Sequence, residues 1–196
     1  MSDPKTLAVY DAKIDDYTKM TEDDAAGGHL ARFIDSLPAT AHVLDLGCGP
    51  GHAAAAIQAR GMSVDAIDAS AEMVKHARDV LNVPARQATF DDIEAVDTYD
   101  GIWASFSLLH APRADMPRYL SALKTALKPG GTLSLGMKLG TGEARDALGR
   151  FYTYYTQPEL FGLLTAAGFT VADHRLGGGV GLDGTTSDWI TITAHG

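Results

Sequence analysis

The chain has 196 residues, a length that suits one large domain or two small ones. Hydrophobic residues make up 45% of it and charged residues 21%, which is typical of a globular protein and excludes a disordered chain. The net charge of −9 disfavours nucleic acid as a partner, and the single cysteine, Cys48, excludes a disulfide framework and any zinc site with more than one thiolate.

The N-terminal 40 residues are expected to form a helical segment ahead of the main domain. Residues 43–46 predict a short strand that ends in a cluster of glycines. The alanine-rich residues 52–60 predict a helix, which Gly61 is placed to end. Residues 63–68 alternate as a second strand, and Ser70 caps a helix that runs to about residue 81.

The rest of the chain continues this alternation of strands and helices. The further strands are expected at 85–90, 99–106, 132–137, 169–172 and 189–193, and the further helices at 117–128 and 157–167. Such alternation predicts β–α–β units and a mainly parallel sheet covered on both faces. The last two strands have only a glycine-rich connection, residues 176–187, between them, so we expect them to pair antiparallel. The prediction is one α/β domain.

The strongest chemical signal is the sequence V-L-D-L-G-C-G-P-G at residues 43–51. Glycines at 47, 49 and 51 let the backbone turn tightly and approach a ligand, and the next helix presents its free N–H groups there. In an open α/β sheet, nucleotides bind beyond the carboxyl end of this strand. Asp68, at the end of the second strand, is placed to accept both hydroxyls of a ribose.

Two cofactor classes compete for this geometry. The dinucleotide fingerprint is G-x-G-x-x-G, whereas the spacing here is G-x-G-x-G. Asp45 also stands two residues before the first glycine, where a carboxylate repels a pyrophosphate and suits a ligand with positive charge.

On these residues the sequence resembles the class I S-adenosylmethionine-dependent methyltransferases, from Val43 almost to the end of the chain. Further matches, in family order, are Ile67 with Asp68, residues 89–91 (T-F-D), residues 99–103 (Y-D-G-I-W) and residues 127–133 (L-K-P-G-G-T-L). Within the superfamily, residues 108–113 and 142–152 resemble small bacterial methyltransferases, some of them labelled as tellurite-resistance proteins.

The resemblance implies a single Rossmann-like, doubly wound domain over residues 1–196. Its seven-stranded, mostly parallel sheet has the order 3-2-1-4-5-7-6, with the last strand antiparallel. Residues 1–40 form the helical N-terminal lid, residues 41–139 the cofactor-binding core, and residues 140–196 the substrate loops with the C-terminal helix and strands. The implied cofactor is S-adenosylmethionine, with S-adenosylhomocysteine as product, and no metal is expected.

The resemblance also assigns cofactor-binding residues. They are Asp45, Gly47, Cys48, Gly49, Gly51, Asp68, Ala69, Phe90, Asp91 and Ser105, together with Tyr10 and Tyr17 from the N-terminal segment. Asp45 either contacts the amino-acid end of the cofactor or only organises the loop. The family often has a glycine where this chain has Phe90, so the adenine acid is either Asp91 or Asp92. Tyr10 and Tyr17 either offer cation–π contacts to the sulfonium or belong to an ordinary packed helix.

Other residues are expected at the reaction end of the site. His110 is the candidate base and substrate contact, because a neutral imidazole accepts a proton near neutral pH; otherwise it caps a helix or packs under the loop. The substrate-binding candidates are Arg113, Arg145, Arg150, Tyr152 and Tyr154, which would grip a small anion such as a carboxylate or else form a solvated helix face.

The predicted function is methyl transfer to a small molecule through O, N, S or a metalloid oxyanion. The alternatives are a noncatalytic regulatory protein that binds S-adenosylmethionine or S-adenosylhomocysteine, and a nicotinamide-dependent oxidoreductase. The sequence has no run of about 18 apolar residues, so no membrane helix is predicted. The N-terminus does not resemble a secretory signal. We therefore expect a cytoplasmic, bacterial protein that is a monomer or a homodimer, with no membrane or nucleic-acid partner.

Overall fold

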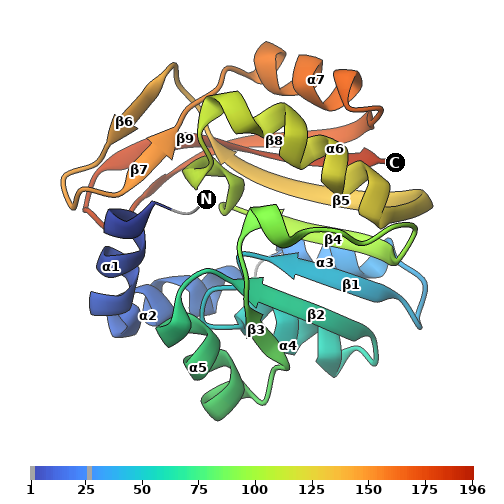
Figure 1. Cartoon of the computed structure of the whole chain (residues 1–196), viewed down its shortest axis with the longest axis horizontal. Coiled ribbons are helices and arrows are strands. Elements are labelled where there is room, and N and C mark those ends of the chain that lie inside the picture. Colours follow the sequence, from blue (N-terminus) through green and yellow to red (C-terminus); the bar gives the residue numbers. More distant parts are fainter. Residues whose placement is uncertain (1–2, 26–27) are drawn as a thin grey trace.

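A twisted sheet between two layers of helices forms the body of the computed structural model, which describes residues 3–25 and 28–196 (Figure 1). Within these residues the main sheet has seven strands in the order β3-β2-β1-β4-β5-β9-β8. They are β1 (His42–Leu46), β2 (Ser63–Asp68), β3 (Ala85–Gln87), β4 (Tyr99–Ser105), β5 (Leu127–Lys138), β8 (Thr170–Val180) and β9 (Thr186–His195). β9 runs antiparallel to both of its neighbours, and the other pairs are parallel. Counted within this sheet alone, the order is the predicted 3-2-1-4-5-7-6.

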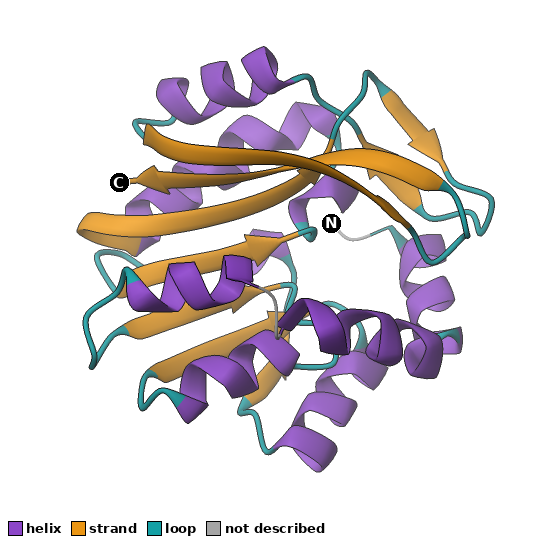
Figure 2. Ribbon diagram, turned by 180° about the vertical axis from the view of Figure 1, so that it is seen from behind, coloured by secondary structure: helices purple, strands orange, loops and turns teal. Residues whose placement is uncertain are grey.

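The two faces of the sheet carry different helices, as the opposite views in Figures 1 and 2 show. α3 (Gly28–Asp35), α4 (His52–Ala59) and α5 (Ala71–Leu81) cover one face, and α6 (Met116–Ala126) and α7 (Gln157–Ala166) cover the other. Their buried apolar residues form two core clusters, one on each side of the sheet. β1 lies between the two clusters and is apolar from Val43 to Leu46 except for Asp45, as expected for a parallel strand buried on both faces.

The predicted helical N-terminal segment contains α1 (Pro4–Ala12) and α2 (Ile14–Ala25), ahead of α3. α1 begins where it does because Asp3 caps it: the Asp3 carboxylate accepts the Thr6 N–H at 2.8 Å, and Pro4 takes the first helical position. α1 lies beside α5 and beside a hairpin that follows β5 (Figure 1).

This hairpin is an addition that the sequence pattern did not predict. β6 (Glu143–Arg145) and β7 (Phe151–Thr153) pair antiparallel in a small second sheet, within the segment expected to hold substrate loops. Short 3-10 turns lie at Phe90–Asp92, Leu108–His110 and Arg113–Asp115.

The last two strands are longer than predicted. The segment expected as a connection, residues 176–187, extends β8 to Val180 and starts β9 at Thr186, so only the residues between them turn. One of the glycines that suggested a loop, Gly177, has a packing role: a Cβ there would lie 2.3 Å from the Trp189 ring of the neighbouring strand. The expected antiparallel pairing of the two strands is confirmed.

Residues 3–25 and 28–196 contain no helix that is long and apolar enough to cross a membrane. Among the side chains of residues 3–21 and 28–196, no group of three or more His, Cys, Asp or Glu is clustered so that it could hold a metal ion.

Candidate active site

The glycine loop after β1 adopts a backbone conformation that favours glycine. Gly47 has a φ of 73° and Gly49 a φ of 53°, in the left-handed region. The Gly47 and Cys48 N–H groups both donate to the Ile67 carbonyl, at 2.8 and 2.9 Å, which holds the loop against the end of β2. A Cβ on Gly47 would lie 2.4 Å from the Ser107 Cβ. The loop therefore approaches the end of β4 too closely for any side chain at position 47.

The other two loop candidates, Gly51 and Cys48, are packed inside the protein. Gly51 is the residue before α4, with a φ of 96°, and a Cβ there would lie 2.8 Å from the Ala77 Cβ of α5. Cys48 is buried, and its burial raises the pKa of the thiol far above the usual range. A thiol that stays protonated is a poor nucleophile. Neither residue lines the cavity described below.

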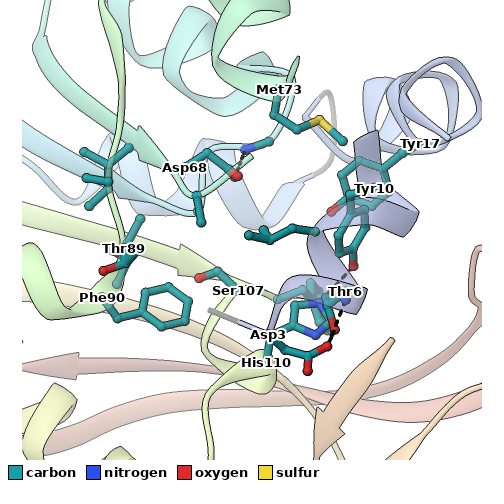
Figure 3. Close-up of a pocket in the computed structure, with 18 residues that line it drawn as sticks. Asp3, Thr6, Tyr10, Tyr17, Asp68, Met73, Thr89, Phe90, Ser107 and His110 are labelled. Carbon is teal, nitrogen blue, oxygen red and sulfur yellow. Dashed lines mark hydrogen bonds between the residues drawn. The ribbon is translucent and has the colours of Figure 1, made fainter. Parts of the chain in front are cut away.

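Asp68 connects the glycine loop to the start of α5. Its Oδ2 accepts the Gly49 N–H at 2.9 Å (Figure 3). Its Oδ1 accepts the Ser70 N–H at 2.8 Å. Burial raises the pKa of this carboxyl, although the two N–H donors favour its charged form. A carboxylate oxygen has more than one lone pair, so both oxygens keep the capacity to accept further hydrogen bonds from a ligand.

Asp45 lies under the loop and is 1% exposed. Its Oδ2 has no hydrogen-bond partner among the described residues. Burial and the nearby Asp68 charge raise the pKa of Asp45 to about 7. A buried, unpartnered carboxyl oxygen costs free energy unless a positive or hydrogen-bonding group compensates it, so the position suits a ligand with a positively charged end.

The raised pKa of Asp45 predicts a proton linkage. Its value in the unfolded chain is about 3.8, so the folded protein loses stability as pH rises from about 4 to 7, by about 1.4 kcal/mol for each pH unit of the shift. A cationic ligand that favours the carboxylate should therefore release a proton when it binds near pH 7. Calorimetric titration with S-adenosylmethionine in buffers of different ionisation enthalpy measures this release. Asp45→Asn should reduce it and stabilise the free protein at pH 8; unchanged proton release in the variant would contradict the assignment.

A cavity of about 700 Å³, open mouth included, lies over the carboxyl ends of β1, β2 and β4 (Figure 3). Its lining residues are Asp3, Thr6, Leu7, Tyr10, Tyr17, Leu46, Gly47, Gly49, Ile67, Asp68, Ala69, Met73, Ala88, Thr89, Phe90, Phe106, Ser107 and His110. The loop, the end of β2 and helix α1 therefore surround one space, although α1 is far from the others in sequence.

At one end of the cavity, Phe90 stands with Ala88 and Thr89 beyond β3. Asp91, the expected adenine acid, does not line the cavity; its Oδ1 accepts from Arg118 at 2.6 Å and from the Tyr119 hydroxyl at 3.1 Å. The alternative acid, Asp92, accepts from the Thr89 N–H at 2.7 Å and so closes the 3-10 turn.

Phe106 and Ser107, which follow β4, line the cavity, whereas Ser105 at the end of β4 does not. Phe106 has a φ of 56°, a strained value for a bulky residue, and such strain is concentrated at functional sites. Ser107 is 7% exposed, and its hydroxyl has no hydrogen-bond partner among the described residues. A free buried hydroxyl beside the glycine loop is a ready contact for a polar ligand.

Tyr10 and Tyr17 close the cavity from the N-terminal helices. Their rings meet edge to face with centroids 4.9 Å apart (Figure 3). A Cβ on Gly49 would lie 3.4 Å from the Tyr17 ring, so this ring lies directly over the loop. Both tyrosines named from the sequence therefore line the cavity.

His110 lies at the opposite end of the cavity from Phe90, with both ring nitrogens bonded. Nδ1 is 2.6 Å from the Phe151 carbonyl oxygen, and Nε2 is 2.9 Å from the Tyr10 hydroxyl. A carbonyl oxygen only accepts, so Nδ1 carries the proton and Nε2 accepts from Tyr10. Burial lowers the pKa of His110 to about 4. The imidazole is therefore neutral near pH 7, and the lone pair of its Nε2 already accepts the hydrogen bond from Tyr10.

The arginines expected to bind substrate are all engaged elsewhere. Arg145 forms an ion pair with Asp3 through two hydrogen bonds, at 2.9 and 2.8 Å. Arg150 is 2% exposed and is paired with Asp146 at 2.7 Å. Arg113 donates to Glu159 and to the Tyr154 carbonyl. None of the three arginines lines the cavity.

The two candidate tyrosines lie behind the cavity wall. Tyr152 is buried against His110, with ring centroids 4.7 Å apart, and Tyr154 stacks on Tyr152 at 6.0 Å. Neither of them lines the cavity. They support His110 from the hairpin side.

Sequence reasoning named Tyr10 of α1 but missed the other lining residues of α1 and the one from α5. Asp3, Thr6 and Leu7 line the cavity from α1 and its cap, and Met73 lines it from α5. The start of α1 carried a usable signal, because an acid followed by proline and, three residues on, by threonine is typical of a capped helix start.

The fold and the site define a Rossmann-like domain that binds a nucleoside cofactor at the carboxyl ends of its strands. Residues 43–131 match the family described as "Methyltransferase domain". The strand order, the glycine loop and Asp68 agree with this match, and over these residues the chain is similar to the class I S-adenosylmethionine-dependent methyltransferases. The cofactor of those proteins is S-adenosylmethionine.

Similar proteins have several activities. A ubiquinone biosynthesis O-methyltransferase of Xanthomonas axonopodis is 35% identical over 105 residues, which are 50% of this chain and 43% of the relative. An S-adenosyl-L-methionine-dependent Diels-Alderase of Talaromyces variabilis is 34% identical over 110 residues, 51% of this chain and 37% of the relative. The matches thus span less than half of either relative.

A solved structure extends the likeness to nearly the whole fold. The 1,6-didemethyltoxoflavin-N1-methyltransferase of Burkholderia thailandensis, crystallised with its substrate and S-adenosylhomocysteine, superposes with a TM-score of 0.75 at 24% identity. The superposition covers 96% of this chain and 87% of that one. At this identity the likeness concerns the fold.

Proposed function

We propose that this protein transfers a methyl group from S-adenosylmethionine to a small-molecule acceptor. The observation that carries the proposal is the arrangement of the glycine loop and Asp68, joined by the 2.9 Å Gly49–Asp68 hydrogen bond, around one cavity. When bound, S-adenosylmethionine supplies an electrophilic methyl group: the acceptor's lone pair attacks the methyl carbon while the carbon–sulfur bonding pair moves to sulfur.

The residues of the cavity fit this cofactor from end to end. Phe90 offers a face for adenine, Asp68 offers charged acceptors for the ribose hydroxyls, and Gly47 and Gly49 line the cavity without side chains. The buried Asp45, whose pKa of about 7 leaves it partly protonated in the free protein, would become fully ionised when a cationic ligand binds. The acidic and aromatic character of the site supports a sulfonium ligand over a dinucleotide, whose pyrophosphate Asp45 would repel.

The protein's own side chains contribute by positioning the reactants and by excluding water from them. In-line displacement needs nucleophile, methyl carbon and sulfur held in a row, and such positioning supplies much of the rate without a protein nucleophile. His110 and Tyr10 form a neutral, hydrogen-bonded wall at the reaction end. We propose that they orient the acceptor and that its proton leaves to solvent, because the His110 lone pair is already occupied.

The test of this function is transfer of labelled methyl from S-adenosylmethionine to a panel of small molecules, with S-adenosylhomocysteine formation measured in parallel. Methylated product with an equal amount of S-adenosylhomocysteine is expected. If the protein binds the cofactor but neither product forms with any acceptor, the noncatalytic regulatory alternative is favoured instead.

We propose that α1 and α2, in the N-terminal segment of residues 1–40, act as a lid. α1 covers the cavity and is fastened at three points: Asp3 to Arg145, the Thr6 hydroxyl to the Phe151 N–H at 2.8 Å, and Asp11 to the Ser70 hydroxyl. With these contacts made, α1 narrows the opening of the cavity, so we expect entry and exit of the cofactor to be faster when α1 moves away.

The lid proposal predicts faster cofactor exchange when a fastening is removed. Arg145→Gln breaks the exposed pair with Asp3 and should raise the dissociation rate of S-adenosylhomocysteine by about two- to fivefold, as expected for a surface ion pair. Stopped-flow displacement measures this rate. Arg60→Gln, which removes the exposed pair with Asp35 away from the lid, is the matched control. Equal rates in the two variants would argue against the fastening role.

A further inference from the structure

The charge of the cavity wall restricts which acceptor it can hold, given the proposed function. Among the described residues that line it, the carboxylates of Asp3 and Asp68 carry formal charge, and no lysine or arginine does so. His110 adds no positive charge, because its Nδ1–H bond to the Phe151 carbonyl and its Nε2 bond from Tyr10 fix it as a neutral imidazole.

The nearby cations lie behind the residues that line the cavity, and the nearest of them, Arg150, donates to the Tyr10 hydroxyl. Arg145 is paired with Asp3, and Arg150 is buried against Asp146. The Lys138 ammonium lies 4.5 Å from the centre of the Tyr152 ring, behind the wall, and Lys138 does not line the cavity. Moving an anion from water into this space would cost its hydration without a partner charge in return.

The polar groups of α1 and of the 3-10 turn Leu108–His110 at the reaction end are also satisfied internally. The Tyr10 hydroxyl donates to His110 and accepts from Arg150 at 3.2 Å. The Thr6 hydroxyl donates to Asp3 and accepts the Phe151 N–H. What remains for an acceptor is apolar and aromatic surface, contributed by Leu7, Phe106 and the ring of Tyr10, with the free hydroxyl of Ser107 nearby.

We propose that the methyl acceptor is an uncharged aromatic molecule and that the cavity excludes carboxylates and metalloid oxyanions. This inference rests on the proposed function, and it overturns the anion-binding role that the sequence suggested for Arg145, Arg150 and Arg113. A flat ring fits between apolar and aromatic walls without the desolvation cost of a charged group, and it can carry an O–H, N–H or S–H group as the methyl acceptor. The acceptor atom gains the methyl group and loses its proton to water.

The test compares matched probes that differ only in charge. A set of hydroxy- and amino-substituted benzamides and the corresponding benzoates is titrated into the full chain by ligand-observed NMR, with and without S-adenosylhomocysteine. The benzamides should bind at least about tenfold more tightly than their benzoate partners, and tellurite and selenite should not compete with them. Equal or tighter binding of the benzoates, competition by the oxyanions, or no binding of any benzamide would overturn the proposal.

A variant pair tests whether the missing cation causes the exclusion. Leu7 lines the cavity from α1, so Leu7→Lys adds a cation there, and Leu7→Gln is the matched neutral control. Leu7→Lys should remove most of the preference for benzamides, whereas Leu7→Gln should keep it; the same preference in both variants would contradict the inference. Circular dichroism checks that both fold. Because the charge preference is also measured without the cofactor, a failure of S-adenosylhomocysteine to bind would count against the proposed function alone.

Discussion

Asp68→Asn is expected to weaken S-adenosylmethionine binding by at least tenfold while leaving the protein folded. The carboxylate holds the Gly49 and Ser70 N–H groups with its two oxygens, and the ribose hydroxyls would complete its acceptor capacity. Asparagine keeps one oxygen and turns the other acceptor into a donor. Hydrogen bonds to a charged group contribute about 1.5–3 kcal/mol each, so the loss of one corresponds to about tenfold or more in affinity.

The matched control for this prediction is Asp65→Asn on the same strand. Asp65 is partly exposed and accepts from the Tyr99 hydroxyl at 2.9 Å, away from the cavity. Its replacement should leave the cofactor affinity unchanged. Isothermal titration calorimetry measures both variants, and an Asp68→Asn affinity equal to that of the wild type would refute the ribose role.

Gly47→Ala is expected to abolish measurable cofactor binding and to lower the melting temperature clearly. The new methyl group would lie 2.4 Å from the Ser107 Cβ, and the φ of 73° strains any other residue. The loop and the end of β4 would have to separate, because neither atom is at the end of a flexible side chain. That movement disturbs the loop, Ser107 and the Asp68 contacts together.

Gly61→Ala separates the clash from the backbone strain. Gly61 has a φ of 83°, close to that of Gly47, but nothing lies within 4 Å of its Cβ position. It should cost about 1 kcal/mol of stability from the left-handed backbone alone and leave cofactor binding intact. Differential scanning calorimetry and cofactor titration on both variants give the comparison. Similar binding in the two would show that the close approach at Gly47 is unimportant.

The core of the fold could be predicted because its signals are local. The glycine loop, the capping Ser70 and the alternation of 63–68 each act within a few residues of the chain, and they appear at the expected places. The length of β8 was underestimated because it depends on a contact with another strand. Gly177 indicates a loop when only the sequence is considered, but in the structure the Trp189 ring of the partner strand occupies the space beside it.

The site was only partly predictable for the same reason. Sequence shows that Arg145 carries a charge but not that Asp3, 142 residues away, neutralises it. Likewise, His110 looks like a candidate base until its two partners, Tyr10 and Phe151, are known. Residue types mark possible chemistry, and the tertiary contacts decide which side chains remain free to perform it.

The most direct measurement of the central claim is calorimetric titration of the full chain with S-adenosylmethionine and, separately, with NAD. The acidic G-x-G-x-G loop and Asp68 predict one S-adenosylmethionine bound per chain and no heat from NAD. Binding of NAD without binding of S-adenosylmethionine would contradict the account.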